Sequence, residues 1–331
     1  MPLKIVINDC DDATLKTRQV LNDQLEQTTN SQTHWYEASS PAEYRRWRRE
    51  GANGYPKPFH HPDAKMIEIP STHGSHSIPL RIIPPQGGQA QGVYLHFHAG
   101  GMVIGSASAH DAMHAKIATG TQLVVVSVEY RLAPEHIFPA AVEDCLDAAL
   151  FALAPGGESK LGGKLRVLAG ESAGGYLTVA TTLNLRALGI DVREKLAAIV
   201  PGYGIFDYTY TPSMFSHKRR IIMGFDDAKS FIETAIPLDK YPMETRKQPK
   251  ISPLYDDLTH LPPGLFVCGT QDPLLDDSVF MASKYYLAGN TTELQLVKEG
   301  CHGFTLFPIG EIADEGINAT IDFVLRSLRS A

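Results

Sequence analysis

The pentapeptide Gly170-Glu171-Ser172-Ala173-Gly174 is the stretch of this sequence with the clearest chemical potential. It directly follows the apolar run 165–169 and closely precedes the apolar stretch 176–183. Between a strand and a helix, a G-x-S-x-G sequence forms a sharp turn that lifts the serine hydroxyl above the edge of a sheet. The pattern therefore predicts that Ser172 is a nucleophile at a strand-to-helix turn.

A serine nucleophile requires a base, usually a histidine, which a carboxylate orients. Asp272 and His302 each come just past a predicted strand, in the chain order serine, aspartate, histidine. Asp276 and Asp277 are alternatives for the acid, but they fall at the start of a predicted helix, where a carboxylate is expected as a cap. The order favours Asp272 and His302 as the partners of Ser172.

Acyl chemistry at a serine also requires hydrogen-bond donors for the oxyanion that forms. The tetrapeptide His98-Ala99-Gly100-Gly101 ends a predicted strand, and the N–H groups of its glycines can turn toward a ligand. The N–H group of Ala173, next to the nucleophile at the helix start, is a further donor. We therefore predict that Gly100, Gly101 and Ala173 form an oxyanion hole.

The elements that must position these residues are short strands alternating with helices. The apolar runs that predict strands are 66–69, 78–83, 93–98, 123–128, 165–169, 195–200, 264–268 and 294–297. Helices are predicted near 108–119, 140–153, 276–288 and 311–329, and after the serine to about residue 188. The first two strands favour an antiparallel edge pair. The alternation predicts an α/β fold with a mostly parallel, eight-stranded sheet and helices on both faces.

Two stretches do not follow this alternation. Residues 1–62 form a predicted N-terminal cap segment, and residues 63–331 form the catalytic domain, with a predicted helical insertion at about 203–260. Four aromatic residues lie at the beginning of the insertion: Tyr203, Phe206, Tyr208 and Tyr210. They either line a substrate pocket or pack between cap and core.

The N-terminal segment contains two predicted helices. The first is amphipathic, and its apolar side chains are Leu15, Val20, Leu21 and Leu25. The second begins after Ser40, with Ser40 as the N-cap and Glu43 as its capping-box partner. This second helix carries the basic cluster Arg45-Arg46-Trp47-Arg48-Arg49, which we interpret as a solvated helix face rather than a phosphate-binding patch.

Composition narrows the function further. The 331 residues carry a formal net charge of −7, which argues against nucleic acid as the main partner. The four cysteines, Cys10, Cys145, Cys268 and Cys301, form no C-x-x-C pair and are predicted free thiols in a reducing compartment. No run of 18 apolar residues occurs, and the histidines lack a metal-ligand spacing. We expect a cytoplasmic protein with no stable membrane insertion, no metal and no cofactor.

The sequence resembles the hormone-sensitive-lipase-like (bacterial family IV) esterases of the α/β-hydrolase fold over roughly residues 66–329. The residues that carry the resemblance are His98-Ala99-Gly100-Gly101, 128–135, Phe138-Pro139-Ala140-Ala141 with Asp144, 170–175, Asp272-Pro273-Leu274 with Asp276, and His302-Gly303-Phe304. Two positions depart from the family pattern: Ala99 replaces the first glycine of H-G-G-G, and Glu171 replaces the more usual aspartate. Neither change removes a catalytic group.

The resemblance implies a catalytic triad of Ser172, Asp272 and His302, and a structural role for the segment 130–135. It also implies a helical cap made of the N-terminal segment, residues 1–62, and a cap insertion at about 203–260. It implies a serine carboxylic-ester hydrolase that acts on small to medium acyl esters or on lactones through an acyl-enzyme. Family members are often dimers, which allows a homodimer. Two alternatives share the scaffold: a non-hydrolytic ligand receptor like the plant gibberellin receptor, which lacks the histidine found here, and a dehydratase like the plant hydroxyisoflavanone dehydratases, which retain the triad.

Overall fold

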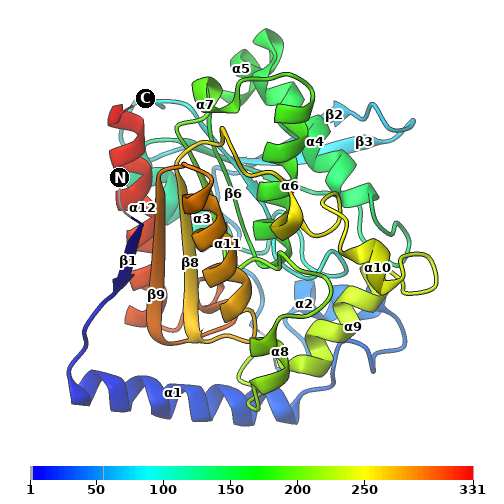
Figure 1. Cartoon of the computed structure of the whole chain (residues 1–331), viewed down its shortest axis with the longest axis vertical. Helices are drawn as coiled ribbons and strands as arrows, with labels where there is room; N and C mark the ends of the chain where they lie inside the picture. Colours follow the sequence, from blue (N-terminus) through cyan, green and yellow to red (C-terminus); the bar gives the residue numbers. More distant parts are fainter. Residues whose placement is uncertain (1–2, 55, 331) are drawn as a thin grey trace.

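The computed structural model describes residues 3–54 and 56–330. Within these residues, nine strands form one sheet in the order β1-β9-β8-β7-β6-β4-β5-β3-β2 (Figure 1). The strands are β1 (Lys4–Ile7), β2 (Lys65–Pro70), β3 (Ser77–Ile83), β4 (Val93–Phe97), β5 (Val124–Val128), β6 (Leu165–Glu171), β7 (Ala198–Gly202), β8 (Gly264–Gln271) and β9 (Thr292–Cys301). Strands β2 and β3 are antiparallel, as predicted, and the strands from β5 to β1 across the sheet pair in parallel.

The sheet has one strand more than the eight predicted. Residues Lys4–Ile7 lie inside the predicted cap segment, yet they form β1, which pairs in parallel with Glu293–Leu296 of β9. Ile5 and Ile7 are 55% and 48% exposed, so β1 buries little apolar surface. The strand forms because the edge of β9 offers backbone groups with which β1 can pair. Since β9 lies almost 300 residues away in the sequence, the local pattern of residues does not predict this pairing.

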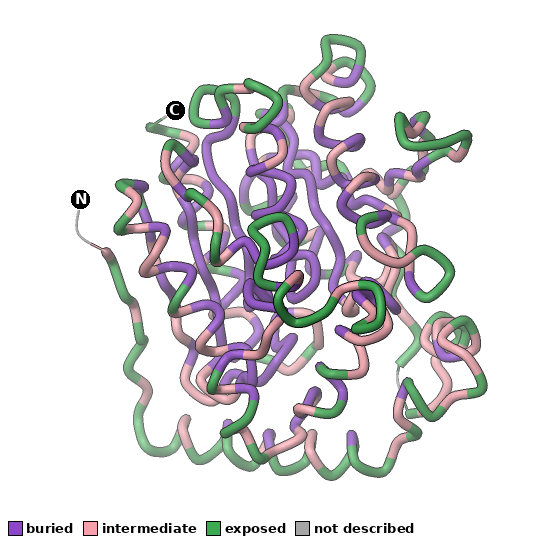
Figure 2. Tube along the Cα trace, turned by 45° about the vertical axis from the view of Figure 1, so that its right-hand side comes forward, coloured by how far each residue is buried: buried purple, intermediate pink, exposed green. Residues whose placement is uncertain are grey.

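Helices cover both faces of the sheet, as the alternation predicted. The helices are α1 (Asp12–Ser31), α2 (Pro41–Glu50), α3 (Asp111–Thr121), α4 (Ala140–Leu153), α5 (Pro155–Leu161), α6 (Ala173–Ala187), α7 (Val192–Lys195), α8 (Pro212–Ser216), α9 (Phe225–Ala235), α10 (Met243–Arg246), α11 (Leu275–Leu287) and α12 (Glu311–Ser330). Helices α4, α6 and α11 pack in the core of one face, and α3 and α12 in the core of the other. Figure 2 shows the central strands buried between these layers.

Helix α1 confirms the first predicted helix, and of its predicted apolar face Leu21 and Leu25 pack half-buried against the core, whereas Val20 does not. Val20 is 48% exposed, whereas the side chains that the helix buries are polar: Arg18, Asn22 and Thr29. Arg18 donates to the Lys298 carbonyl at 2.9 Å, and Asn22 donates to the Glu299 carbonyl at 2.9 Å. The helix therefore docks along the carboxyl end of β9 through hydrogen bonds to backbone, which hydrophobic periodicity does not detect (Figure 1).

Helix α2 begins where the sequence predicts. The Ser40 hydroxyl accepts from the Glu43 N–H at 3.1 Å, so Ser40 is the N-cap. The Glu43 carboxylate accepts from the Ser39 hydroxyl. The cap insertion is helical, as expected, and contains α8, α9 and α10.

The N-terminal segment and the insertion meet beyond the carboxyl ends of the strands. The Trp35 and Phe231 rings stack with their centroids 4.4 Å apart, and the Thr29 hydroxyl donates to the Ile221 carbonyl at 2.7 Å. Arg219 of the insertion bonds Glu26 of α1 at 2.7 Å. These contacts support our proposal that the two segments act together as a cap.

Two further sequence predictions concern the whole chain. All four cysteines are free thiols, as predicted. Within the described ranges, no helix combines the length and apolar character that a bilayer crossing demands.

Candidate active site

Ser172 occupies a strained turn between β6 and α6. Its backbone angles are φ 58° and ψ −117°, a conformation that a non-glycine residue adopts only where the surroundings enforce it. The flanking glycines are required by space: a Cβ atom on Gly170 would lie 2.4 Å from the Phe97 carbonyl oxygen, and one on Gly174 would lie 1.9 Å from the same atom. The turn therefore packs directly against the end of β4, with the serine at its tip.

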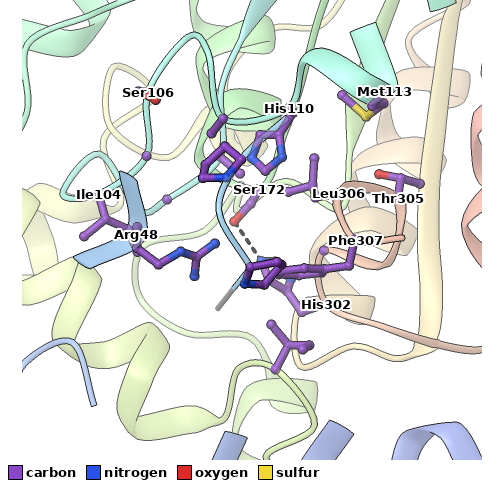
Figure 3. A pocket seen from close by; sticks show the side chains of 18 of the residues that line it. Arg48, Ile104, Ser106, His110, Met113, Ser172, His302, Thr305, Leu306 and Phe307 are labelled. Atoms are coloured by element: carbon purple, nitrogen blue, oxygen red, sulfur yellow. Dashed lines mark hydrogen bonds between the residues drawn. The ribbon is translucent and has the colours of Figure 1, made fainter. Parts of the chain in front are cut away.

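The structure brings Ser172, His302 and Asp272 together. The Ser172 hydroxyl oxygen lies 2.8 Å from Nε2 of His302 (Figure 3). On the other side of the ring, Nδ1 lies 3.0 Å and 2.9 Å from the two carboxylate oxygens of Asp272. All three side chains are buried, with at most 8% of each residue exposed. The imidazole is thus held between a hydroxyl and a carboxylate, in the geometry of a serine nucleophile with an oriented base.

The acid and the base come from neighbouring strand ends. Asp272 directly follows β8, and its carboxylate also accepts from the Leu274 N–H at 2.8 Å, which fixes its orientation. His302 directly follows β9, which pairs with β8 in parallel. The two alternative candidates for the acid form hydrogen bonds to the insertion instead. Asp277 accepts from the Phe206 N–H at 2.7 Å, and Asp276 accepts from the Ser213 N–H at 2.8 Å.

The predicted oxyanion segment lies beside the serine. Gly100 and Gly101 have φ angles of 119° and 64°, and both line the same cavity as Ser172. A Cβ atom on Gly100 would lie 2.2 Å from the Ile104 carbonyl oxygen, so this position requires glycine. Ala173 lines a second, smaller cavity together with Gly101 and Ser172. The three residues predicted to donate therefore line cavities that Ser172 also lines.

Tyr130 and Glu129 hold this segment in place. The Tyr130 hydroxyl donates to the His98 carbonyl at 2.7 Å, and its ring stacks on the His98 imidazole with centroids 4.0 Å apart. The Glu129 carboxylate accepts from the Ala107 N–H at 2.7 Å. The sequence analysis left Tyr130 outside the site as structural, and its contacts are those of a residue that positions the oxyanion segment.

A buried polar pair lies beneath the nucleophile. The Glu171 carboxyl lies 2.7 Å from Nε2 of His96, whose Nδ1 lies 3.0 Å from the Ser127 hydroxyl. Burial raises the pKa of Glu171 to about 8 and lowers the pKa of His96 to about 3. Both groups are therefore neutral near pH 7, and the protonated carboxyl donates to the imidazole. The glutamate that replaces the usual aspartate thus has a partner of its own.

Ser172 lies between two cavities of different size and polarity. The larger has a volume of about 610 Å³ and is also lined by His302. The smaller has a volume of about 30 Å³, and its lining is mostly apolar, with Ile205, Tyr208 and Phe231 among its residues. Of the insertion aromatics, Tyr208 therefore lines a pocket, whereas the Tyr203 ring packs 5.3 Å from the His302 ring, measured between centroids.

The basic cluster of α2 does not form a purely solvated face. Arg45, Arg48 and Arg49 line the larger cavity, and only Arg46 of the four arginines is outside its lining. Figure 3 shows the Arg48 side chain at this cavity. The prediction of a solvated face holds for Arg46 and Arg49, which are exposed, but it missed the cavity, because the helical pattern shows which side chains share a face and not what that face meets. Trp35, Phe231 and the arginines are among the lining residues that the sequence analysis did not assign to the site.

Known proteins share this fold and sequence. The family whose members have the α/β hydrolase fold matches residues 94–306. The arylesterase of Saccharolobus solfataricus is 32% identical over 236 residues, which cover 69% of this chain and 73% of the relative. The structure of a hyperthermophilic esterase from the archaeon Pyrobaculum calidifontis superimposes with a TM-score of 0.77 at 29% identity, over 100% of both chains.

A second similar structure belongs to a named esterase family within that fold. An esterase of the bacterial hormone-sensitive lipase family has a TM-score of 0.77 at 25% identity, over 97% of this chain and 100% of the other. The chain belongs to the α/β-hydrolase family of hormone-sensitive-lipase-like esterases. This finding confirms the predicted fold class and the resemblance.

Proposed function

We propose that this protein is a serine carboxylic-ester hydrolase that works through Ser172, His302 and Asp272 and an acyl-enzyme intermediate. The observation that carries the proposal is the unbroken chain of contacts from the Ser172 hydroxyl through the His302 imidazole to the Asp272 carboxylate, at 2.8 Å and 2.9 Å. Arrangement in this order makes an unreactive hydroxyl a nucleophile at neutral pH.

The reaction proceeds in two acyl transfers. Ser172 Oγ attacks the ester carbonyl carbon while its proton passes to Nε2 of His302, and Asp272 stabilises the imidazolium. The N–H groups of Gly100, Gly101 and Ala173 stabilise the oxyanion. His302 then protonates the leaving alkoxide, which departs as the alcohol. Water, deprotonated by His302, attacks the acyl-enzyme and releases the acid and the free serine.

The two cavities support an assignment of the two halves of the ester. The leaving oxygen must lie within reach of His302, which lines the larger cavity, so the alcohol part belongs there. The acyl part then enters the smaller cavity. A volume of about 30 Å³ exceeds the roughly 10–15 Å³ that one water molecule needs, and it suits a short acyl chain. This supports the short end of the proposed acyl range; a lactone would open by the same chemistry.

The proposal is tested with 4-nitrophenyl esters from acetate to dodecanoate. We expect the wild-type enzyme to favour the shortest chains. Replacing the nucleophile in Ser172→Ala should lower kcat by about 10⁴-fold or more, because the triad acts as a unit. The matched control is Ser159→Ala, which removes an exposed hydroxyl on α5 and should leave kcat unchanged. A serine-directed organophosphate should add its mass to the peptide that contains Ser172.

Equal, slow nitrophenol release by the wild type and by Ser172→Ala would contradict a hydrolase. It would favour the two alternatives, a ligand receptor or a dehydratase on the same scaffold. His302 and its contact with Ser172 favour hydrolysis over the receptor, since a binding protein has no need of a base at this position.

A further inference from the structure

The two cavities beside Ser172 share one boundary. Among the described residues, those that line both cavities are Gly101, Ser172, Met223 and Phe231. Gly101 has no side chain, and the side chain of Ser172 is the proposed nucleophile. The boundary therefore consists mainly of the side chains of Met223, which lies just before α9, and Phe231, which lies on α9.

The Phe231 ring is held at this boundary by contacts with two other segments. A Cβ atom on Gly101 would lie 2.4 Å from both Cγ and Cδ1 of Phe231, so the ring lies directly against the predicted oxyanion segment. The Trp35 ring stacks on the Phe231 ring, with centroids 4.4 Å and planes 11° apart. A ring packed in this way keeps its position when a substrate enters the smaller cavity.

The other walls of the smaller cavity belong to the core of the protein. Their side chains are at most 8% exposed and pack in one apolar cluster: Ala173, Ile205, Tyr208, Ala228, Ile232 and Leu274. Close-packed core side chains do not separate to admit further carbon atoms. The free space nearest to the end of a longer chain is therefore the larger cavity, on the far side of Met223 and Phe231.

We infer that Phe231 and Met223 determine the acyl-chain length that the enzyme accepts, because they close the smaller cavity toward the larger one. The inference rests on the proposed function, which places the acyl part in the smaller cavity. A volume of about 30 Å³ holds roughly two or three groups of the size of a water molecule, which limits the chain to about that of a butyryl group. The larger cavity, at about 610 Å³, has the room that a longer chain needs once the boundary is opened.

Two esters with the same alcohol part test this limit. 4-Nitrophenyl butyrate and 4-nitrophenyl octanoate differ by four methylene groups in the acyl chain, so the ratio of their kcat/KM values reports how well the longer chain is accommodated. We expect the wild type to favour the butyrate. Phe231→Ala and Met223→Ala should each raise the ratio of octanoate to butyrate by about tenfold or more, because the opened boundary lets the additional methylene groups leave water.

Two control variants separate the boundary from other effects. Phe225→Ala removes a half-buried phenylalanine of the same helix that lines neither cavity, and it should leave the ratio unchanged. Trp35→Ala removes the stacking contact but keeps the Phe231 ring against Gly101, so it should affect both esters alike. Met223→Ala keeps the stack of Trp35 on Phe231 and tests the boundary even if Phe231→Ala does not fold. Circular dichroism and the melting temperature establish which variants are folded.

A wild type that hydrolyses the octanoate as efficiently as the butyrate would overturn the inference. So would an unchanged ratio in the folded boundary variants, or an equal gain in Phe225→Ala or Trp35→Ala. None of these results affects the proposed function as long as butyrate hydrolysis disappears in Ser172→Ala. Conversely, if Ser172→Ala hydrolyses the butyrate like the wild type, the proposed function fails first, and the boundary has no acyl group to select.

Discussion

At the scale of single residues, the protonation state of Glu171 affects the stability of the turn that carries Ser172. It precedes Ser172, is 7% exposed and meets a neutral histidine, His96, rather than a cation. Ionisation therefore places an uncompensated charge beneath the turn, which is costly in a buried site. The folded protein is most stable while the Glu171 carboxyl is protonated.

This predicts a loss of stability between weakly acidic and weakly alkaline pH that depends on Glu171. Its pKa rises from the ordinary 4.5 to about 8 on folding, so its contribution is complete below about 4.5, declines as the pH rises between these two values and is lost once the pH has risen through about 8. We expect the melting temperature of the wild type, compared with that of Glu171→Gln, whose amide stays neutral, to fall between about pH 5 and 8 and to change little above about pH 9. Glu50→Gln, an exposed carboxylate on α2, is the control. Parallel curves for Glu171→Gln and the wild type would refute this prediction.

At the scale of elements, the oxyanion segment is a loop whose shape depends on contacts from β5 and the turn after it. Tyr130 follows β5 and donates to the carbonyl of His98, two residues before Gly100. Loops without regular backbone pairing keep one conformation only where such contacts fix them. The geometry of the proposed oxyanion hole therefore depends on a side chain that lines neither cavity.

Tyr130→Phe should slow the reaction without weakening substrate binding. The variant keeps the ring stacked on His98 and removes one buried hydrogen bond, which costs about 1 kcal/mol of stability. We expect kcat to fall several-fold with little change in KM, because the oxyanion forms only during the reaction. Tyr94→Phe is the matched control, since the buried Tyr94 hydroxyl has no partner among the described residues. A proportional rise in KM, or an unchanged kcat, would contradict a positioning role.

At the scale of the whole molecule, two segments distant in sequence enclose the cavity together. The N-terminal segment is anchored by α1 to β9, through Arg18 and Asn22, and by stacking of Trp35 on Phe231 of α9 (Figure 1). Phe231 lines both cavities, so this stack joins the N-terminal segment to the cavities beside Ser172. The cap and the cavity should therefore respond together to a change at Trp35.

Trp35→Ala removes the stacking contact with Phe231, so the N-terminal segment should be held less firmly over the cavity. The residue is 5% exposed, so the loss of packing should also lower the stability of the protein, by about 3 kcal/mol. We expect KM for esters with large alcohol parts to rise more than KM for methyl acetate, measured by proton release at constant pH. Equal changes for both substrates would indicate general destabilisation. Trp47→Ala is the control, because Trp47 is a half-buried tryptophan of the same segment that packs against the core and does not line the cavity.

The sequence by itself determined the elements and the candidate triad. The strands and helices of the central sheet follow from short apolar runs and their alternation, which are local properties. Ser172, Asp272 and His302 could be assigned because parallel strands bring their carboxyl ends to one edge of a sheet, so chain order and position at strand ends predict proximity. These predictions needed no knowledge of which residues meet at a distance.

Only the tertiary structure decided where β1, α1 and α2 pack against the rest of the protein. Strand β1 exists because β9 has a free edge, α1 docks with Arg18 and Asn22 on backbone carbonyls, and three arginines of α2 face a cavity. In each case the partner lies far away in the sequence. Periodicity records which side chains share a face, whereas the environment of that face depends on packing between distant segments.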